Sequence, residues 1–409
     1  METRKFNYLR SLKLRKLISD HPNRQRSENS YQQLLLTSTH STQKPINSNK
    51  QQLTEISMPS LELEHTFTGH KDKCWSISLH NKLPLLATAS SDKTCRIYNL
   101  KTKQQIATLD DNAHTKTMRT VAFKPTGDFP SLAIGSFDST VSIWGNDLNY
   151  EDLSETTQGE WELMALIEGH ENEIKSVDWS HDGSYLATCS RDKSIWIWEA
   201  DEANEEFECV SVIQEHEQDV KFVKWHPYKN ILASCSYDDT CRIFKQDEYD
   251  SDDWECVANL TGANGTIWSC DFEKKEDGVV RLVNCSDDSI VRVWKSSGGS
   301  NNSGSGSGDG LPSTLKDEEL WTLESELPYV HKGAVYSVEW NKEGLIASCG
   351  SDGKIVIYQE KSNGRGWEIL LVNDLSHEVY ELNCLKWVNN TELLSAGDDG
   401  TVKLWKIKY

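Results

Sequence analysis

Short apolar runs alternate with clusters of polar turn residues from residue 61 to the end of the sequence. One phrase recurs: a strand of small and apolar residues, a tight turn around an aspartate, and a second strand ending on an aromatic residue. The copies read LATASSDKTCRIY, LAIGSFDSTVSIW, LATCSRDKSIWIW, LASCSYDDTCRIF, LVNCSDDSIVRVW, IASCGSDGKIVIY and LLSAGDDGTVKLW. Stretches such as Ser-Ile-Trp-Ile-Trp fit strands that are buried on both faces. The pattern therefore predicts an all-β fold of seven like units.

The aromatic residues that end the phrases set the period of the repeat. They follow one another at intervals of 46, 54, 46, 50, 64 and 47 residues, at Tyr98, Trp144, Trp198, Phe244, Trp294, Tyr358 and Trp405. The pattern resembles the WD40 family over about residues 61–409, whose repeats are about 40–45 residues long. This resemblance implies a seven-bladed WD40 β-propeller, in which each four-stranded sheet stands between two others around a central axis.

The two ends of the repeat region are expected to complete each other. The last unit, LLSAGDDGTVKLWKIKY, stops after its third strand, whereas LELEHTFTGH at 61–70 holds a strand-like stretch with no strands of its own ahead of it. We predict that this N-terminal strand pairs with the strand of Trp405. Such pairing closes the ring and removes the exposed edge that an open propeller would leave.

Two segments differ in composition from the repeats. Residues 1–57 are rich in Lys, Arg, Gln, Asn, Ser and Thr without sustained periodicity, which predicts a basic, disordered N-terminal extension. Its opening, METRKFNYLRSLKLRKLI, leaves open a mitochondrial-type targeting signal, and Met58 leaves open a second start. The Gly/Ser run SSGGSNNSGSGSGDG predicts a flexible insert at about 296–315 inside the propeller domain.

Charge and cysteine usage narrow the classes of function. The chain has 64 acidic and 43 basic residues, a net charge of −21, which disfavours binding to nucleic acid. It has no apolar run long enough to cross a bilayer, so no membrane association is expected. The 11 cysteines include no C-x-x-C pair and match neither zinc-finger nor ferredoxin-type spacing. We interpret them as free thiols in a reduced compartment and expect no metal and no cofactor.

Histidine, a hydroxyl residue and aspartate recur together, which invites comparison with the hydrolytic triad. A catalytic group occurs once per site, whereas this set repeats in nearly every unit and ends on an indole, which can only donate a hydrogen bond. We therefore interpret it as a structural tetrad and expect no enzymatic activity. The complete examples are His170, Thr188, Asp192 and Trp198 in the third unit, and His377, Ser395, Asp399 and Trp405 in the seventh.

Other units lack part of the tetrad. Ile134 replaces the hydroxyl residue in the second unit. In the fifth, Ala263 replaces the histidine and Asn284 the hydroxyl residue. We predict that such units rely more on packing than on hydrogen bonds, and that the fifth is the loosest.

The repeat register directs two sets of side chains to one mouth of the ring: the residue before each turn aspartate and the residue four before the end of each first strand. Cations gather there in units two to four and aromatic residues elsewhere, a mixture typical of protein interfaces. We expect these residues to hold an acidic, aromatic-bearing segment of a partner: Trp75, Arg119, Lys175, Arg191, Lys221, Tyr237, Trp268 and Tyr336. The alternative is a solvated rim whose cations pair with Glu173 or Asp219.

Three acidic inserts are expected on the opposite face, between third and fourth strands: GNDLNYEDLSETTQGE, EADEANEEFE and KQDEYDSDDWE. They are either solvated loops or a docking site for a second, basic partner.

Several phrases go beyond what a propeller requires, namely GSFDSTVSIW, IEGHENEIKSV, LATCSRDKSIWIWE, QEHEQDVKFVKWHP, CSYDDTCRIF and DDWECVANL. From about residue 67 to the end they resemble the WD40 protein of cytosolic iron-sulfur protein assembly. The resemblance implies a non-catalytic scaffold, cytoplasmic and nuclear, that ligates no cluster and helps deliver clusters to iron-sulfur apoproteins.

The same resemblance implies three partners: a small MIP18-type protein, a large HEAT-repeat adaptor and an iron-only-hydrogenase-like cluster carrier. Arg191 matches a surface arginine of that family. A generic WD40 scaffold, such as a ubiquitin-ligase receptor or a chromatin reader, is the alternative, because the fold alone does not specify a partner.

Overall fold

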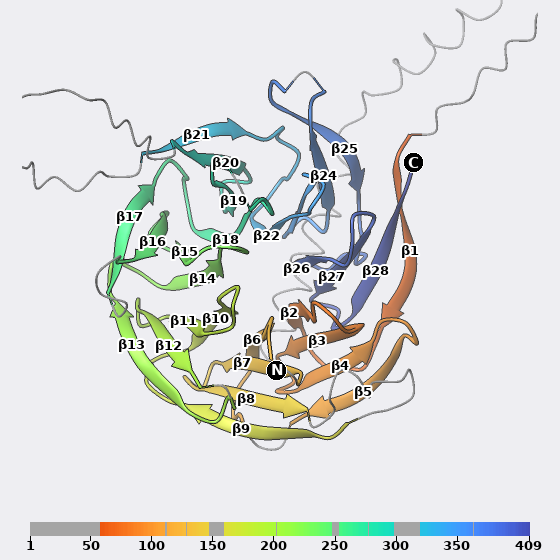
Figure 1. Cartoon of the computed structure of the whole chain (residues 1–409). Coiled ribbons are helices and arrows are strands. Elements are labelled where there is room, and N and C mark those ends of the chain that lie inside the picture. The colour runs from red at the N-terminus through yellow and green to blue at the C-terminus, as the bar shows by residue number, and fades with distance from the viewer. Residues whose placement is uncertain are drawn as a thin grey trace, which may run out of the picture. The chain divides into compact units, whose positions relative to one another are not determined.

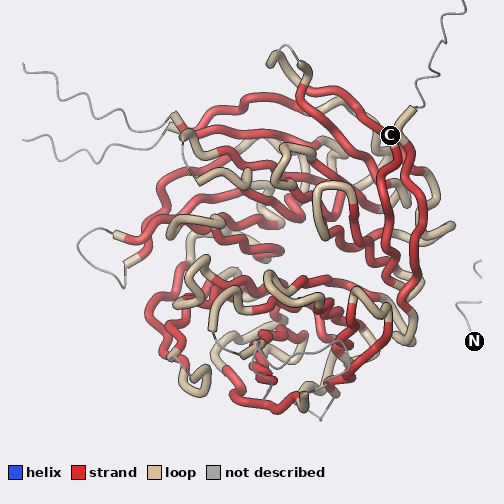
Figure 2. Tube along the Cα trace, turned by 45° about the vertical axis from the view of Figure 1, so that its right-hand side comes forward, coloured by secondary structure: helices blue, strands red, loops and turns tan. Residues whose placement is uncertain are grey.

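The computed structural model describes residues 58–110, 113–127, 129–146, 159–201, 203–247, 253–276, 278–297, 320–362 and 364–409. These residues form 28 strands in seven four-stranded antiparallel sheets arranged as a ring (Figure 1). The described part of the chain contains no helix, and so none that could cross a membrane (Figure 2). The predicted all-β, seven-bladed propeller is confirmed. The predicted N-terminal extension at 1–57 and most of the Gly/Ser insert lie outside the described residues.

Each blade runs from an inner strand beside the central axis to an outer strand at the rim (Figure 1). The first four blades are β2 (Cys74–Leu79), β3 (Leu85–Ser90), β4 (Cys95–Asn99) and β5 (Gln104–Leu109); β6 (Met118–Phe123), β7 (Ser131–Ser136), β8 (Val141–Asn146) and β9 (Trp161–Ile167); β10 (Ile174–Trp179), β11 (Tyr185–Ser190), β12 (Ile195–Ala200) and β13 (Phe207–Ile213); and β14 (Val220–Trp225), β15 (Ile231–Ser236), β16 (Cys241–Gln246) and β17 (Trp254–Leu260).

The last three blades follow the same plan, except that the outer strand of blade 7 comes from the start of the propeller. They are β18 (Ile267–Phe272), β19 (Arg281–Ser286), β20 (Val291–Ser296) and β21 (Trp321–Glu326); β22 (Val335–Trp340), β23 (Ile346–Gly350), β24 (Ile355–Glu360) and β25 (Trp367–Asn373); and β26 (Leu382–Trp387), β27 (Glu392–Gly397), β28 (Val402–Lys408) and β1 (Ser60–Phe67).

The ring closes through β1 and β28, which lie side by side in Figure 1. Their antiparallel register runs from Ser60 opposite Lys408 to Phe67 opposite Val402. The predicted closure of the last blade by the N-terminal strand is confirmed. Because β1 comes from the start of the repeat region and pairs with β28, blade 7 has four strands like every other blade.

The core is divided into seven apolar clusters, each shared by two neighbouring blades. In the one between blades 3 and 4, for example, Ile195 and Ile197 pack with Val220 and Val223, and all four are buried. Every blade therefore contributes to two clusters, one on each face of its sheet. This two-sided burial explains why second strands such as β7 and β15 are buried at every position.

Side chains on the inner strands also join neighbouring blades by hydrogen bonds. Asp178 of blade 3 accepts from the backbone N–H of Trp225 in blade 4 (2.8 Å), and Asp271 of blade 5 accepts from that of Trp340 in blade 6 (2.9 Å). Glu339 of blade 6 accepts in the same way from Trp387 of blade 7. These carboxylates surround a central cavity of about 80 Å³. Polar contacts near the axis thus fix the spacing of the blades.

The four long inserts connect third strands to fourth strands. They join β8 to β9, β12 to β13, β16 to β17 and β20 to β21, as predicted. Since the aspartate turns connect second strands to third strands, the inserts leave the sheets at the opposite face. Most of the acidic residues in these inserts lie outside the described part of the chain.

Candidate protein-binding face

The tetrad of blade 3 is a continuous hydrogen-bond chain inside one sheet. The indole N–H of Trp198 donates to Thr188 Oγ1 (3.0 Å), and the same oxygen lies 2.9 Å from His170 Nε2. His170 Nδ1 lies 2.7 Å from Asp192. Because the indole can only donate and the carboxylate can only accept, the chain has one direction, from Trp198 to Asp192. The tetrad connects the strands to the aspartate turn.

Hydrogen bonding also sets the charge of the turn aspartate. Burial alone would raise the pKa of Asp192, but hydrogen bonds from His170 and Ser194 outweigh it and lower the pKa to about 2. Asp192 also accepts from the backbone N–H of Glu171 (3.0 Å), which holds the loop before the inner strand. The Asp192 carboxylate is therefore ionised, and its hydrogen bonds lie within its own blade.

The tetrad of blade 7 has the same geometry. Trp405 Nε1 donates to Ser395 Oγ (2.8 Å), His377 Nε2 lies 2.8 Å from that oxygen, and His377 Nδ1 lies 2.9 Å from Asp399. The His377 side chain is fully buried. Neither tetrad combines residues of different blades, and neither imidazole is open to solvent, so the geometry offers no place for a substrate.

In blade 2 the prediction of an incomplete hydrogen-bond chain was wrong. Ser142 of β8 supplies the missing hydroxyl: it lies 2.8 Å from His114 Nε2 and accepts from Trp144 Nε1 (2.9 Å). In the strand register Ser142 lies directly opposite Ile134, the residue that occupies the usual hydroxyl position. Either of two paired residues can therefore place an oxygen between the histidine and the indole.

Blade 5 uses a guanidinium in place of the imidazole. Arg292 forms two contacts with the turn aspartate Asp288 (3.2 and 2.7 Å) and is 3% exposed. Arg292 lies opposite Asn284 in the register, so the third strand again compensates for the second. This blade thus keeps a polar link to its turn, which the repeat pattern did not predict. Its being the loosest blade remains a prediction.

A β-bulge explains why one residue of each inner strand faces the mouth of the ring. In all seven blades the register between the first and second strands shifts around the second residue of the inner strand. A bulge of this kind turns a side chain out of the sheet. The residues at the bulges are six of those predicted for this face and, in blade 7, Asn383; the six are Trp75, Arg119, Lys175, Lys221, Trp268 and Tyr336.

Cations and aromatic rings alternate around this face. The guanidinium of Arg119 lies 4.8 Å from the ring centre of Trp75, and the Lys175 ammonium lies 4.4 Å from that of Phe137. Lys221 lies between two rings, 5.0 Å from Tyr237 and 5.6 Å from Trp268. These contacts order the cations without neutralising them.

The aromatic side of the face is held by its own hydrogen bonds. The rings of Trp268 and Tyr336 meet edge to face at 5.2 Å. The indole of Trp268 donates to Asp287, and the Tyr336 hydroxyl donates to Glu381 (3.2 Å). Trp75 donates to Ser91 Oγ (2.7 Å). The structure therefore places these aromatic side chains in fixed orientations on one surface.

Carboxylates neutralise only some of the cations on this face. Arg191 pairs with Glu173 (3.2 Å) and Lys221 with Asp219 (3.1 Å), the pairings of the solvated-rim alternative. The Arg191 side chain is nevertheless 57% exposed. Among the described residues, no carboxylate lies within ion-pair distance of Arg119 or Lys175.

Burial, with smaller contributions from the neighbouring Lys221 and Arg119, lowers the pKa of Lys175 to about 8, although Glu173 acts in the opposite direction. Burial also lowers the pKa of Arg119. A partner anion at this position would relieve the repulsion among the three cations. Lys73 and Glu381 also lie at this face, and the repeat pattern did not predict them. Both precede an inner strand, and that position is the signal that could have found them.

Comparison with known proteins supports the propeller fold and identifies the family of WD40 proteins to which the chain belongs. The family model for the WD domain, G-beta repeat, matches residues 61–99, 103–145, 161–199, 207–245, 254–295, 321–359 and 371–406. A relative from Candida dubliniensis, named probable cytosolic iron-sulfur protein assembly protein 1, is 49% identical over 385 residues, which covers 85% of this chain and 100% of the relative. The chain belongs to the cytosolic iron-sulfur protein assembly protein 1 family of WD40 proteins.

Other members of this assembly protein 1 family give the same result. The relative from Kluyveromyces lactis is 52% identical over 355 residues, covering 85% of this chain and 99% of that protein. The relative from Candida albicans is 48% identical over 385 residues, with the same 85% of this chain and 100% of the relative covered. Both have the same name as the Candida dubliniensis protein.

Proposed function

We propose that this chain is a non-catalytic scaffold of cytosolic iron-sulfur protein assembly, which helps deliver clusters to cytosolic and nuclear apoproteins. The observation that carries the proposal is the family membership, at 49% identity over the whole length of a relative with that name. A second support is that the described histidine-aspartate pairs of the tetrads are internal to single blades. The proposed scaffold therefore acts through binding at the surface of the propeller.

The partners in this proposal are a small MIP18-type protein, a large HEAT-repeat adaptor and an iron-only-hydrogenase-like cluster carrier, in cytoplasm and nucleus. The face built on the bulged inner-strand residues is proposed to hold one of them. It combines cations and aromatic rings on an otherwise acidic protein, which suits an acidic segment with an aromatic side chain. A partner carboxylate would lie near Arg119 and Lys175, and a partner ring would pack among Trp75, Tyr237 and Trp268.

Depletion of the protein in cells tests the assembly role. The expected result is loss of activity of cytosolic iron-sulfur enzymes while mitochondrial iron-sulfur enzymes keep theirs. A generic scaffold would leave both classes active, and equal loss in both compartments would place the defect upstream of this protein. Either result would count against the proposal.

Co-purification tests the binding face. An Arg191→Glu, Lys175→Glu protein is expected to fold normally and to lose a partner that the unaltered protein retains. The matched control is Lys342→Glu with Lys361→Glu, which places the same charge change at exposed residues of the β22–β23 and β24–β25 connections, at the face opposite the aspartate turns. If the double variant keeps every partner, the face assignment is wrong even if the assembly role stands.

A further inference from the structure

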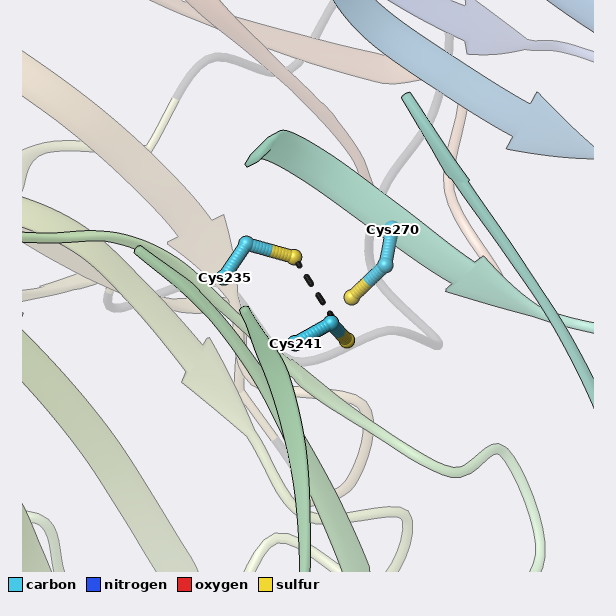
Figure 3. A group of neighbouring side chains, drawn as sticks. All are labelled: Cys235, Cys241 and Cys270. Atoms are coloured by element: carbon cyan, nitrogen blue, oxygen red, sulfur yellow. Dashed lines mark hydrogen bonds between the residues drawn. The ribbon is translucent and has the colours of Figure 1, made fainter. Parts of the chain in front are cut away.

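Three cysteines meet in the core between blades 4 and 5. Cys235 of β15, Cys241 of β16 and Cys270 of β18 bring their sulfur atoms to within 4.8 Å of one another (Figure 3). The Cys235 and Cys241 sulfurs are 3.9 Å apart. All three residues are buried, at 0–1% exposure. The sequence alone predicts free thiols here, because the spacing of the cysteines along the chain matches no metal-binding motif.

The other six blade interfaces provide an internal comparison. The strand register identifies the positions equivalent to Cys235, Cys241 and Cys270, and each of the six holds at least one aliphatic residue in place of a thiol. The equivalent trios are Ala89, Cys95 and Val121; Gly135, Val141 and Val177; Cys189, Ile195 and Val223; Cys285, Val291 and Val338; Cys349, Ile355 and Leu385; and Ala396, Val402 and Ile77. At the other interfaces these positions hold at most one thiol, and the remaining ones are Gly, Ala, Val, Ile or Leu.

Two buried N–H donors without partners lie in the same region. Asn284 is 2% exposed, and its amide nitrogen has no hydrogen-bond partner. It lies opposite Cys270 in the register of β18 and β19. The indole nitrogen of Trp294, a member of the same apolar cluster as the three cysteines, also has no partner. In complete blades a histidine and a hydroxyl occupy this region; here the two donors remain without an acceptor, and thiolate sulfur is an acceptor.

The ligand set indicates which ion would fit. Thiolates select soft ions such as Cu(I) and Zn(II), and zinc in closed protein sites takes four ligands. Among the residues described, no fourth histidine, cysteine or carboxylate joins the group. Three sulfurs placed in a plane about 2.3 Å from a central ion would lie about 4 Å apart, close to the 3.9 Å between Cys235 and Cys241.

We propose that Cys235, Cys241 and Cys270 form a buried trigonal thiolate site for a single Cu(I) ion, with the N–H groups of Asn284 and Trp294 stabilising the sulfur ligands. The ion displaces the thiol protons, which pass to solvent, and no change of oxidation state is involved. Because the sulfurs are enclosed by two blades, loading accompanies the packing of blade 5 against blade 4. The site is independent of the assembly role and of the binding face.

Metal analysis of the full chain tests this site. The protein is expressed in copper-supplemented cells and purified without oxygen, with Cys209→Ser throughout because Cys209 is exposed. We expect one copper per chain, and X-ray absorption is expected to show Cu(I) with sulfur neighbours only. Stoichiometric zinc in place of copper, a nitrogen or oxygen ligand shell, or copper well below one per chain would overturn the proposal.

Variants that copy other blade interfaces provide the control. Cys241→Val with Cys270→Val reproduces the Val291 and Val338 of the next interface and is expected to fold but to lose its copper. Cys95→Val removes a buried thiol elsewhere, copying Val141, and is expected to keep it. Copper retained by the double variant would contradict the assignment. If that variant fails to fold, the absorption spectrum of the unaltered protein decides alone.

Discussion

The contribution of a buried hydroxyl to stability depends on the groups that it contacts. Two serines of blade 2 illustrate this. Ser142 joins His114 to Trp144, whereas the buried Ser131 Oγ has no partner. We predict that Ser142→Ala lowers the free energy of unfolding by about 2 kcal/mol, because it leaves two buried groups unpaired. Ser131→Ala should change it by less than about 0.5 kcal/mol. Urea denaturation measures both, and equal costs would contradict the hydrogen-bond chain.

Lys175 is expected to give the proposed binding face a pH dependence. Its pKa of about 8 means that it is protonated below that pH, and an acidic partner binds the protonated form. We predict full affinity below pH 8 and weaker binding as the pH rises through and above it. Calorimetric titration of a partner captured through this face would measure the effect.

The control for that pH dependence is Lys175→Arg, whose guanidinium remains charged throughout this range. It should flatten the profile. An unchanged profile in this variant would assign the titration to another group.

Residue spacing also explains what the sequence could and could not reveal. The His170–Asp192 pair was predictable because both residues occupy turns at a separation of 22 that recurs in other blades. The roles of Ser142 and Arg292 were not, because each acts from the third strand, opposite the expected position. Knowledge of which residues pair across two strands, not the motif itself, would have found them. Cys270 needed a further step, the stacking of one blade on the next.

At the scale of strands, we expect the inner-strand carboxylates to contribute most to stability where they are least exposed. Glu339 is 5% exposed, pairs with Lys386 (2.8 Å) and accepts from the backbone of Trp387. We predict that Glu339→Leu costs about 3 kcal/mol or more of unfolding free energy, because a largely buried charge loses its partner. A second change, Lys386→Met, should recover part of that loss.

The control for this pair is the exposed pair of Lys408 and Glu62 (3.8 Å). Glu62→Leu should cost less than about 1 kcal/mol. Denaturation of the single and double variants gives the coupling energy between Glu339 and Lys386. A coupling near zero would mean that the inner-strand pairs do not hold the blades together.

At the scale of the whole molecule, the closing strand should decide stability. A chain that begins at Met58 keeps all 28 described strands, and we expect it to fold like the full chain. A chain that lacks residues 58–67 as well loses β1, including Phe67, which is 2% exposed. We predict a loss of more than about 3 kcal/mol, the cost of removing a buried phenylalanine alone. Thermal unfolding and gel filtration would measure it, and equal stability would contradict closure through β1.

The pairing of β1 with β28 also determines when the molecule can be finished. The ribosome makes β1 first and β28 last, so at about 5–20 residues per second the first strand waits about 20–70 s for its neighbour. Until β28 has been made, β1 has no strand to pair with, and its edge is exposed. Glu62, Glu64 and His65 within β1 place polar side chains on that waiting edge, which discourages it from joining a strand of another chain.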